Sequence, residues 1–130
     1  MGVTDAHGTP IAICVESASP AEVKLVHQTM ERRFTKALPE RLIGDKAYDS
    51  NRLDGEMAAL GIMMISPNRS GTRQTQDGRM LRRYKRRWKV ERTFAWLGFH
   101  RRLVTRYERY ATNFEALIQY ACFFILFKLL

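Results

Sequence analysis

Positive charge is concentrated in one third of this 130-residue chain, and no fold can bury that third unless its charges are paired. Residues 69–109 contain fourteen Lys and Arg against three Asp and Glu, while the whole chain has a net charge of +9. A segment with this balance favours an acidic polymer as its partner, nucleic acid before an anionic membrane surface. A solvated helix face without any partner is the plainer interpretation.

The rest of the composition is typical of a globular protein. Hydrophobic residues make up 45% of the chain and charged residues 27%, which argues against a disordered or fibrous protein. No apolar stretch reaches the roughly 18 residues of a membrane-spanning helix, and the N-terminus has no secretion-signal pattern. Cys14 and Cys122 are too far apart in sequence to form a metal-binding pair. We therefore expect one domain in the reducing cytoplasm, with no membrane partner.

Short apolar runs alternate with helical patterns in the first half of the chain and predict an α/β fold. Two strands around a turn are expected at residues 3–16. A helix is expected from the Ser-Pro pair at 19–20 to about Lys36, and Pro39 prevents it from continuing. The next elements are expected to be a strand at 41–44, a helix at 50–60 and a strand at 62–65.

The second half of the chain is expected to be mostly helical. Residues 68–78 contain no large apolar side chain and are expected to form a polar loop. A long basic helix is expected over 79–97, and a buried apolar helix with a core or oligomer role over 113–130. The single domain would then hold its strands and first helices in 1–67, the polar loop in 68–78, and the basic and apolar helices in 79–130.

Glu91 lies among apolar side chains when residues 80–98 are placed on a helical wheel. A carboxylate in an apolar stripe is costly to bury unless it is paired or bound to a cation. Arg87, one turn earlier, offers an ion pair at the helix surface. The other interpretation is a metal ligand, since Mg²⁺ takes one or two carboxylates together with water or phosphate oxygens.

Asp45 is the matching acid, because it follows the strand expected at 41–44 and ligands bind where the strands of α/β sheets end. A turn residue or helix cap is the plainer interpretation. Asp49 and Ser50 already supply a cap for the next helix, however, which leaves Asp45 without an obvious structural task. Carboxylates that hold divalent metals beside a positive surface suit phosphodiester chemistry.

Three motifs resemble the DDE transposases of bacterial insertion sequences. They are GDKAYDS at 44–50, YKRRWKVERTFAWL at 84–97 and RRLVTRYE at 101–108. The second motif matches the family's Tyr-x₂-Arg-x₃-Glu pattern through Tyr84, Arg87 and Glu91. The family's Lys seven positions after that Glu is replaced by Gly98, with His100, Arg101 and Arg102 nearby as candidate phosphate contacts. The segment TDAHGTPIA also resembles a strand-turn-strand segment of the same domain.

The resemblance implies a ribonuclease-H-like fold, a mixed sheet flanked by helices, which is incomplete at the N-terminus here and has a helical C-terminal tail. Asp45 would be the second and Glu91 the third of three catalytic acids that bind two divalent ions, Mg²⁺ or Mn²⁺. The first acid belongs to a strand before TDAHGTPIA, so we expect weak metal binding, and Asp5 is expected to be a turn residue rather than a substitute. Residues 1–130 would be one partial catalytic domain, from a truncated copy or from the second frame of a split transposase.

The resemblance also implies DNA as the partner and, for the complete enzyme, metal-dependent cleavage and joining of DNA strands in the cytoplasm at the nucleoid. Tyr84 and Arg87 are expected to position the DNA or Glu91. Trp88 is expected to be a core residue and Trp96 the better candidate for base stacking. The candidate phosphate contacts are Arg82, Arg83, Lys85, Arg86, Lys89, Arg101 and Arg102. The alternative is a non-catalytic DNA-binding or regulatory remnant, paired with an N-terminal transposase fragment or with a second copy of itself.

Overall fold

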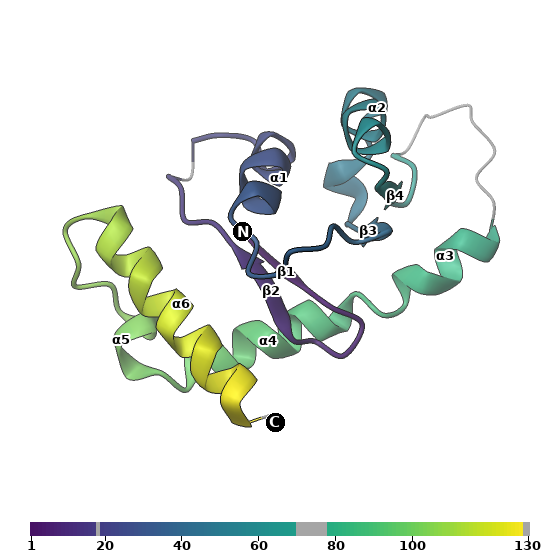
Figure 1. Ribbon diagram of the computed structural model, residues 1–130. Helices are drawn as coiled ribbons and strands as arrows, with labels where there is room; N and C mark the ends of the chain where they lie inside the picture. The colour runs from purple at the N-terminus through teal and green to yellow at the C-terminus, as the bar shows by residue number, and fades with distance from the viewer. Residues whose placement is uncertain (18, 70–77, 129–130) are drawn as a thin grey trace. The chain divides into compact units, whose positions relative to one another are not determined.

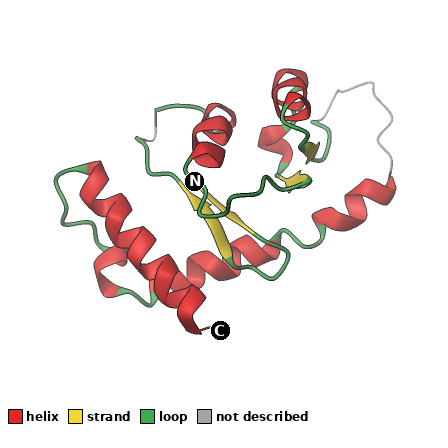
Figure 2. Cartoon of the chain, in the orientation of Figure 1, coloured by secondary structure: helices red, strands yellow, loops and turns green. Residues whose placement is uncertain are grey.

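Two separate two-stranded sheets organise the computed structural model, which describes residues 1–17, 19–69 and 78–128 (Figure 1). One sheet belongs to a unit formed by Met1–Lys36 and Trp88–Leu130, here called the terminal unit. The other belongs to Ala37–Arg87, the central unit. Helices accompany the strands in both units (Figure 2). The mixed α/β class expected from the sequence is therefore confirmed, while the ribonuclease-H-like arrangement and the single domain stay predictions.

In the terminal unit, β1 (Gly2–Thr4) and β2 (Pro10–Ile13) pair antiparallel around a tight turn. Asp5 holds that turn, because its Oδ1 accepts hydrogen bonds from the backbone N–H groups of His7 at 2.7 Å and Thr9 at 2.9 Å. Gly8 has a φ of 84°, in the left-handed region that glycine adopts without strain. The expectation that Asp5 is a turn residue is confirmed.

Four helices complete the terminal unit: α1 (Glu22–Glu31), α4 (Trp88–Gly98), α5 (Arg101–Val104) and α6 (Ala111–Lys128). The helix α1 buries its apolar stripe, including Val26 and Met30, and contacts β2. Helices α4 and α6 contact each other and bury a shared cluster. Its members are Ile13, Leu97, Ala121, Cys122 and Ile125.

In the central unit, β3 (Arg41–Ile43) and β4 (Met63–Ile65) pair in parallel, so a helix has to connect them. The connection contains a 3₁₀ turn, η1 (Lys46–Tyr48), and α2 (Asn51–Ala59). Ser50 caps α2 by accepting a bond from Leu53 N–H at 3.4 Å, and Leu53 and Met57 are buried. A last helix, α3 (Gly78–Tyr84), also contacts β4.

The single basic helix expected over 79–97 is wrong, because a turn at 85–87 separates α3 from α4. The N–H groups of Arg86 and Arg87 bond three residues back, to Arg83 and Tyr84, at 2.9 and 3.0 Å. Continuing the helix would stack cations four residues apart, as in the pair Arg82 and Arg86, and like charges at that spacing destabilise a helix. Most of the expected polar loop, residues 70–77, lies outside the described residues.

The C-terminal helix forms as expected, but only one of its faces is buried. Its buried residues are Ala121, Cys122 and Ile125, whereas several aromatic side chains on the same helix are exposed. Over the described ranges, no helix is both long enough and apolar enough to cross a membrane.

Because Cys122 is buried, we expect the free energy of unfolding of the terminal unit to fall at alkaline pH. Burial raises the pKa of this thiol from 9.0 to about 11. Between these values the unfolded chain loses the thiol proton while the folded chain keeps it, so the free energy of unfolding falls as pH rises, by roughly 1 to 2 kcal/mol. Urea unfolding at about pH 8 and about pH 10 measures this change.

Cys122→Ala is the control, since it removes the thiol and should flatten the alkaline loss relative to the wild-type chain. Equal losses of stability in the two chains would contradict the assignment.

Candidate functional site

Helix α4 is fastened to the turn between β1 and β2 by three side chains that each donate to a backbone carbonyl. Lys89 Nζ donates to Ala6 O, Arg92 Nη2 to His7 O and Thr93 Oγ1 to Gly8 O. Three successive carbonyls of the turn are thus satisfied from one helix face. Glycine suits position 8 mainly because its φ is 84°, and a Cβ atom there would also lie 3.3 Å from the backbone carbonyl of Lys89.

This attachment decides which way Glu91 points. The buried residues of α4 are Thr93 and Leu97, and Glu91, two positions before Thr93, lies about 160° around the helix from it. Glu91 is accordingly exposed, and Trp88 and Phe94 near it are each 50% exposed. The expectations of a buried apolar stripe around Glu91 and of a core role for Trp88 are both wrong. The stripe exists, but contacts with the turn bury the other side of the helix.

The rings of both tryptophans of the chain contact the side chain of the same arginine. The guanidinium carbon of Arg92 lies 5.1 Å from the ring centre of Trp88 and 4.8 Å from that of Trp96. Trp96 is only half-buried, yet it also packs against the cluster around Leu97. Trp96 is therefore a poorer candidate for base stacking than the sequence indicated, since Arg92 and the core already contact it.

Asp45 follows β3 as expected, and the plainer interpretation of it as a helix cap is confirmed, so it does not lack a structural task. It caps η1, because its Oδ1 accepts the N–H bond of Ala47 at 2.8 Å. Ser50 caps α2 independently. Gly44 allows the close packing of Tyr48, since a Cβ atom at Gly44 would lie within 2.9 Å of the tyrosine ring. Asp45 is half-buried, so its cap does not remove it from ligand-accessible surface.

Arg69 fixes the segment that follows Asp45. Its guanidinium donates to the carbonyls of Lys46 at 3.1 Å and Ala47 at 2.7 Å, and its backbone N–H donates to Asp49 Oδ2 at 2.6 Å. Sequence reasoning counted Arg69 only as one cation of the basic segment. A signal was available, because β3 and β4 run in parallel, so residues that follow the two strands meet at one edge of the sheet.

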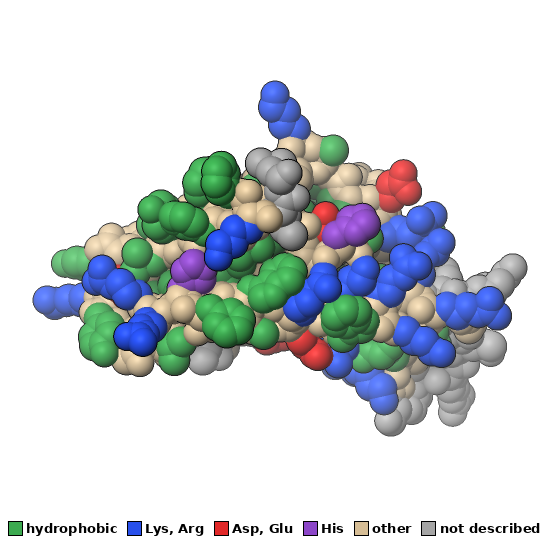
Figure 3. All heavy atoms as spheres, turned by 90° about the horizontal axis from the view of Figure 1, so that it is seen from below, with side chains coloured by type: hydrophobic (Ala, Val, Ile, Leu, Met, Phe, Trp, Pro, Cys, Tyr) green, Lys and Arg blue, Asp and Glu red, His purple; other side chains and the backbone are tan. Residues whose placement is uncertain are grey.

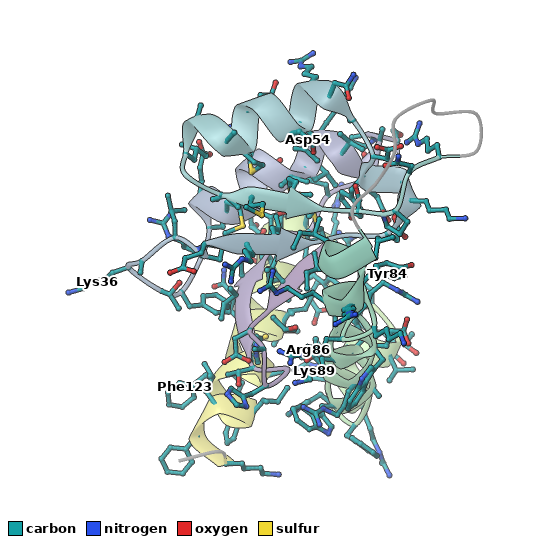
Figure 4. All side chains as sticks on the ribbon, turned by 90° about the vertical axis from the view of Figure 1, so that its right-hand side faces the viewer. Lys36, Asp54, Tyr84, Arg86, Lys89 and Phe123 are labelled. Atoms are coloured by element: carbon teal, nitrogen blue, oxygen red, sulfur yellow. The ribbon has the colours of Figure 1, made fainter. Side chains whose placement is uncertain are left out.

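One carboxylate of the central unit, Asp54, has a shifted pKa. Burial, and secondly the Asp49 carboxylate, raise the pKa of Asp54 in the first turn of α2. Figure 4 labels Asp54 on that helix.

Asp45 lies in the central unit and Glu91 in the terminal unit. Their convergence on a common cation therefore stays a prediction. Within the described ranges, no group of three or more His, Cys, Asp and Glu side chains is arranged to hold a metal ion. The sequence predicted two acidic metal ligands in this chain, Asp45 and Glu91.

The basic residues fall into two classes. Lys89 donates to Ala6 O, and Arg102 pairs with Glu108 at 3.6 Å, so both have protein partners. Arg87 stacks on Tyr84, with 5.7 Å between the guanidinium carbon and the ring centre. Arg87 and Arg102 are exposed despite these contacts, and Figure 3 shows many Lys and Arg side chains on one face. The remaining candidates also have exposed side chains. They are Arg82, Arg83, Lys85, Arg86 and Arg101.

Comparison with known proteins identifies the family of the chain. The sequence pattern of the Transposase DDE domain matches residues 1–126. The chain belongs to this transposase family. It is 33% identical over 128 residues to a protein from Burkholderia cepacia named as a putative transposase for insertion sequence element IS402. The match covers 92% of this chain and 58% of that protein, so the chain spans little more than half the length of this relative.

No solved structure matches the chain. The family recognised from GDKAYDS and YKRRWKVERTFAWL is therefore confirmed by sequence comparison alone, and the roles of individual residues stay predictions.

Of the three side chains that bind α4 to the turn, Thr93 can be replaced with the smallest change in side-chain shape. Thr93→Val removes the buried donor to Gly8 O and should lower the free energy of unfolding by about 1 to 2 kcal/mol. Thr105→Val changes an exposed threonine and should have little effect. Chemical denaturation of both variants measures the difference, and equal stabilities would show that the hydrogen bond does not fix α4.

Proposed function

We propose that this chain is the part of a transposase that carries its second and third acids and a DNA-binding surface, and that the complete protein cleaves and joins DNA strands. The match to the Transposase DDE domain across residues 1–126 carries the proposal. The relative named as an IS402 transposase supports it. Such a protein works at the nucleoid in the cytoplasm. The chain contains both an antiparallel and a parallel strand pair, as a ribonuclease-H-like fold requires.

Asp45 and Glu91 are the residues that would hold Mg²⁺ or Mn²⁺. Their carboxylate oxygens are the donors that these ions prefer. A bound pair of ions would activate the attacking hydroxyl and stabilise the leaving oxygen of the phosphodiester. Asp45 uses Oδ1 to cap η1, so Oδ2 is the oxygen available to a cation. Glu91 is presented to solvent because Thr93 and its neighbours fasten the opposite face of α4.

The DNA contacts in this proposal come from exposed cations. The side chains on α3 and the following turn are Arg82, Arg83, Lys85 and Arg86, and α5 adds Arg101. The stacking of Arg87 on Tyr84 supports a role for both residues in positioning the DNA. Lys89 and Arg102 are weaker contacts, because each would have to leave a protein partner.

A second function, DNA binding without catalysis, is favoured for the chain on its own. Two acids bind divalent ions less tightly than three, and the described residues offer no cluster of three or more ligands. The exposed cations do not depend on the acids. The chain would then occupy DNA as a regulator or combine with an N-terminal transposase fragment.

Binding to DNA should weaken steeply as salt rises, because phosphate contacts release counterions. Replacing Arg82, Arg83, Lys85 and Arg86 by Ala should reduce the slope of log affinity against log salt by about one unit for each phosphate group that is no longer bound. Fluorescence anisotropy with duplex DNA between about 50 and about 200 mM salt measures the slope.

The matched control removes four positive charges elsewhere, by replacing Lys24, Lys36, Arg41 and Arg52 with Ala. These side chains are exposed and lie outside the basic segment, so this control should bind nearly as tightly as the wild-type chain. Equal loss of affinity in both variants would show that net charge alone drives binding. Wild-type affinity that does not change with salt would contradict the phosphate contacts.

Metal-dependent chemistry is tested with Mn²⁺, first for binding and then for nicking of supercoiled DNA. Asp45→Asn should weaken Mn²⁺ binding severalfold without loss of thermal stability, since Asn also caps a helical turn. Asp54→Asn is the control, because Asp54 is not proposed as a ligand. We expect no nicking by this chain alone. Robust nicking that disappears in Asp45→Asn and Glu91→Gln would overturn the non-catalytic function and support the enzymatic one.

A further inference from the structure

The segment that joins α4 to α6 exposes three aromatic rings to solvent. It consists of residues 99–110, includes α5, and is here called the connector. Phe99, Tyr107 and Tyr110 are 82%, 76% and 63% exposed, and the aliphatic side chain of Val104 is 68% exposed. Large apolar side chains that gather at the surface in one short segment are typical of a binding surface rather than of a core.

Arginine side chains are interspersed with these rings along the connector. Glu108 is the only acid among residues 99–110. Figure 3 shows basic and hydrophobic side chains intermingled on the face that it displays. A ligand that fits the connector therefore has to present flat apolar groups and negative charges together. The exposed arginines of the connector are Arg101, Arg102, Arg106 and Arg109.

Contacts within the protein hold the connector in one conformation. Leu103 packs against the buried cluster that α4 and α6 share. Arg102 Nη2 lies 3.6 Å from Glu108 Oε1, and the Glu108 side chain is only 11% exposed. Arg106 Nε donates to the Glu108 carbonyl at 3.0 Å, and its guanidinium carbon lies 5.4 Å from the ring centre of Phe114. The exposed rings are thus carried by a backbone that is fixed from inside.

The pair of Arg102 and Glu108 brings the three rings into one region, because it joins the two ends of the connector. Phe99 precedes Arg102 by three positions, and Tyr107 and Tyr110 are within two positions of Glu108. Three residues span at most roughly 11 Å, so the backbone of each ring lies within about that distance of one member of the pair. A region of this size matches a few successive bases of a nucleic acid strand.

The exposure of the rings distinguishes an unpaired strand from a duplex. In a duplex each base is stacked between its neighbours, and only its edges face the grooves. In an unpaired strand the base faces are open to aromatic side chains, while the phosphates remain available to arginine. Aromatic and basic side chains also suit an anionic membrane surface. Membership of the Transposase DDE family favours nucleic acid.

We propose that the connector binds an unpaired strand of DNA, with its three exposed rings stacked on bases and with Arg101 and Arg109 on phosphates. This inference rests on the proposed DNA-binding function and adds the class of DNA. Glu91 lies in the first turn of α4, which ends at Gly98, so the connector begins roughly 10 Å along the helix axis from that acid. DNA that is opened beside a cleavage site would supply such a strand.

The test compares two single strands that carry the same phosphates. One consists of thymidines, and the other has the same length but abasic sites; about ten nucleotides suit the site size of single-strand binding proteins. Fluorescence anisotropy measures both affinities. The wild-type chain should bind the thymidine strand more than about tenfold more tightly, because stacking on three rings adds to the phosphate contacts. This ratio should change little with salt, since the two strands carry equal charge.

Variants of one ring test whether the connector causes this preference. Tyr107→Ala should reduce the ratio by about fivefold and leave the affinity for the abasic strand unchanged, while Tyr107→Phe keeps a ring and should keep the ratio. Tyr120→Ala is the matched control, because Tyr120 is 62% exposed on α6, outside the connector, and its replacement should not change the ratio. Equal thermal unfolding of the three variants and the wild-type chain checks that all of them fold.

A wild-type chain that binds both strands equally, or a preference that Tyr107→Ala leaves intact, would overturn the proposal. Binding to vesicles of phosphatidylserine that Tyr107→Ala weakens, without a preference for the thymidine strand, would assign the connector to a membrane and also overturn it. Duplex DNA separates this failure from a failure of the proposed function. A chain that binds duplex DNA with the expected salt dependence but ignores bases refutes the connector site alone, whereas a chain that binds no DNA refutes both.

Discussion

The terminal unit depends on the capture of three successive turn carbonyls by one helix. Lys89, Arg92 and Thr93 bind the backbone of Ala6, His7 and Gly8, so a segment near the N-terminus and one more than eighty residues later form one structure. These contacts select the buried face of α4. They also decide that Glu91 faces outward, so the position of the motif acid follows from the turn rather than from the hydrophobic pattern around it.

Some cations of the basic segment contact the protein itself, and others are exposed to solvent. Arg92 holds the turn and lies between two indole rings, and Arg69 holds the segment after Asp45. Arg82 and Arg86 are exposed on α3 and its following turn. Total charge therefore overstates the surface that an anionic polymer can use, because part of the positive segment satisfies carbonyl groups inside the protein.

Local sequence signals predicted those features of the fold that are determined by residues close together in the chain. The strands, the Asp5 turn, the Ser50 cap and the position of Asp45 after a strand all follow from such signals. The orientation of Glu91 could not be predicted, because it depends on tertiary contacts of α4 that a helical wheel does not contain. The break at 85–87 was missed because the wheel takes no account of repulsion between cations four residues apart. Arg69 was missed because its partners lie more than twenty residues earlier in the chain. The motifs were sufficient to predict the family, but they did not predict that aromatic side chains of α6 are exposed.

The packing of Arg92 between Trp88 and Trp96 has a spectroscopic consequence. The chain has two tryptophans, and both lie on α4 against this arginine. All indole emission therefore originates within a single helix of the terminal unit, and fluorescence follows that unit alone. Far-ultraviolet circular dichroism averages over the helices of both units, so a lag between the two signals during denaturation would reveal melting of the halves in separate steps.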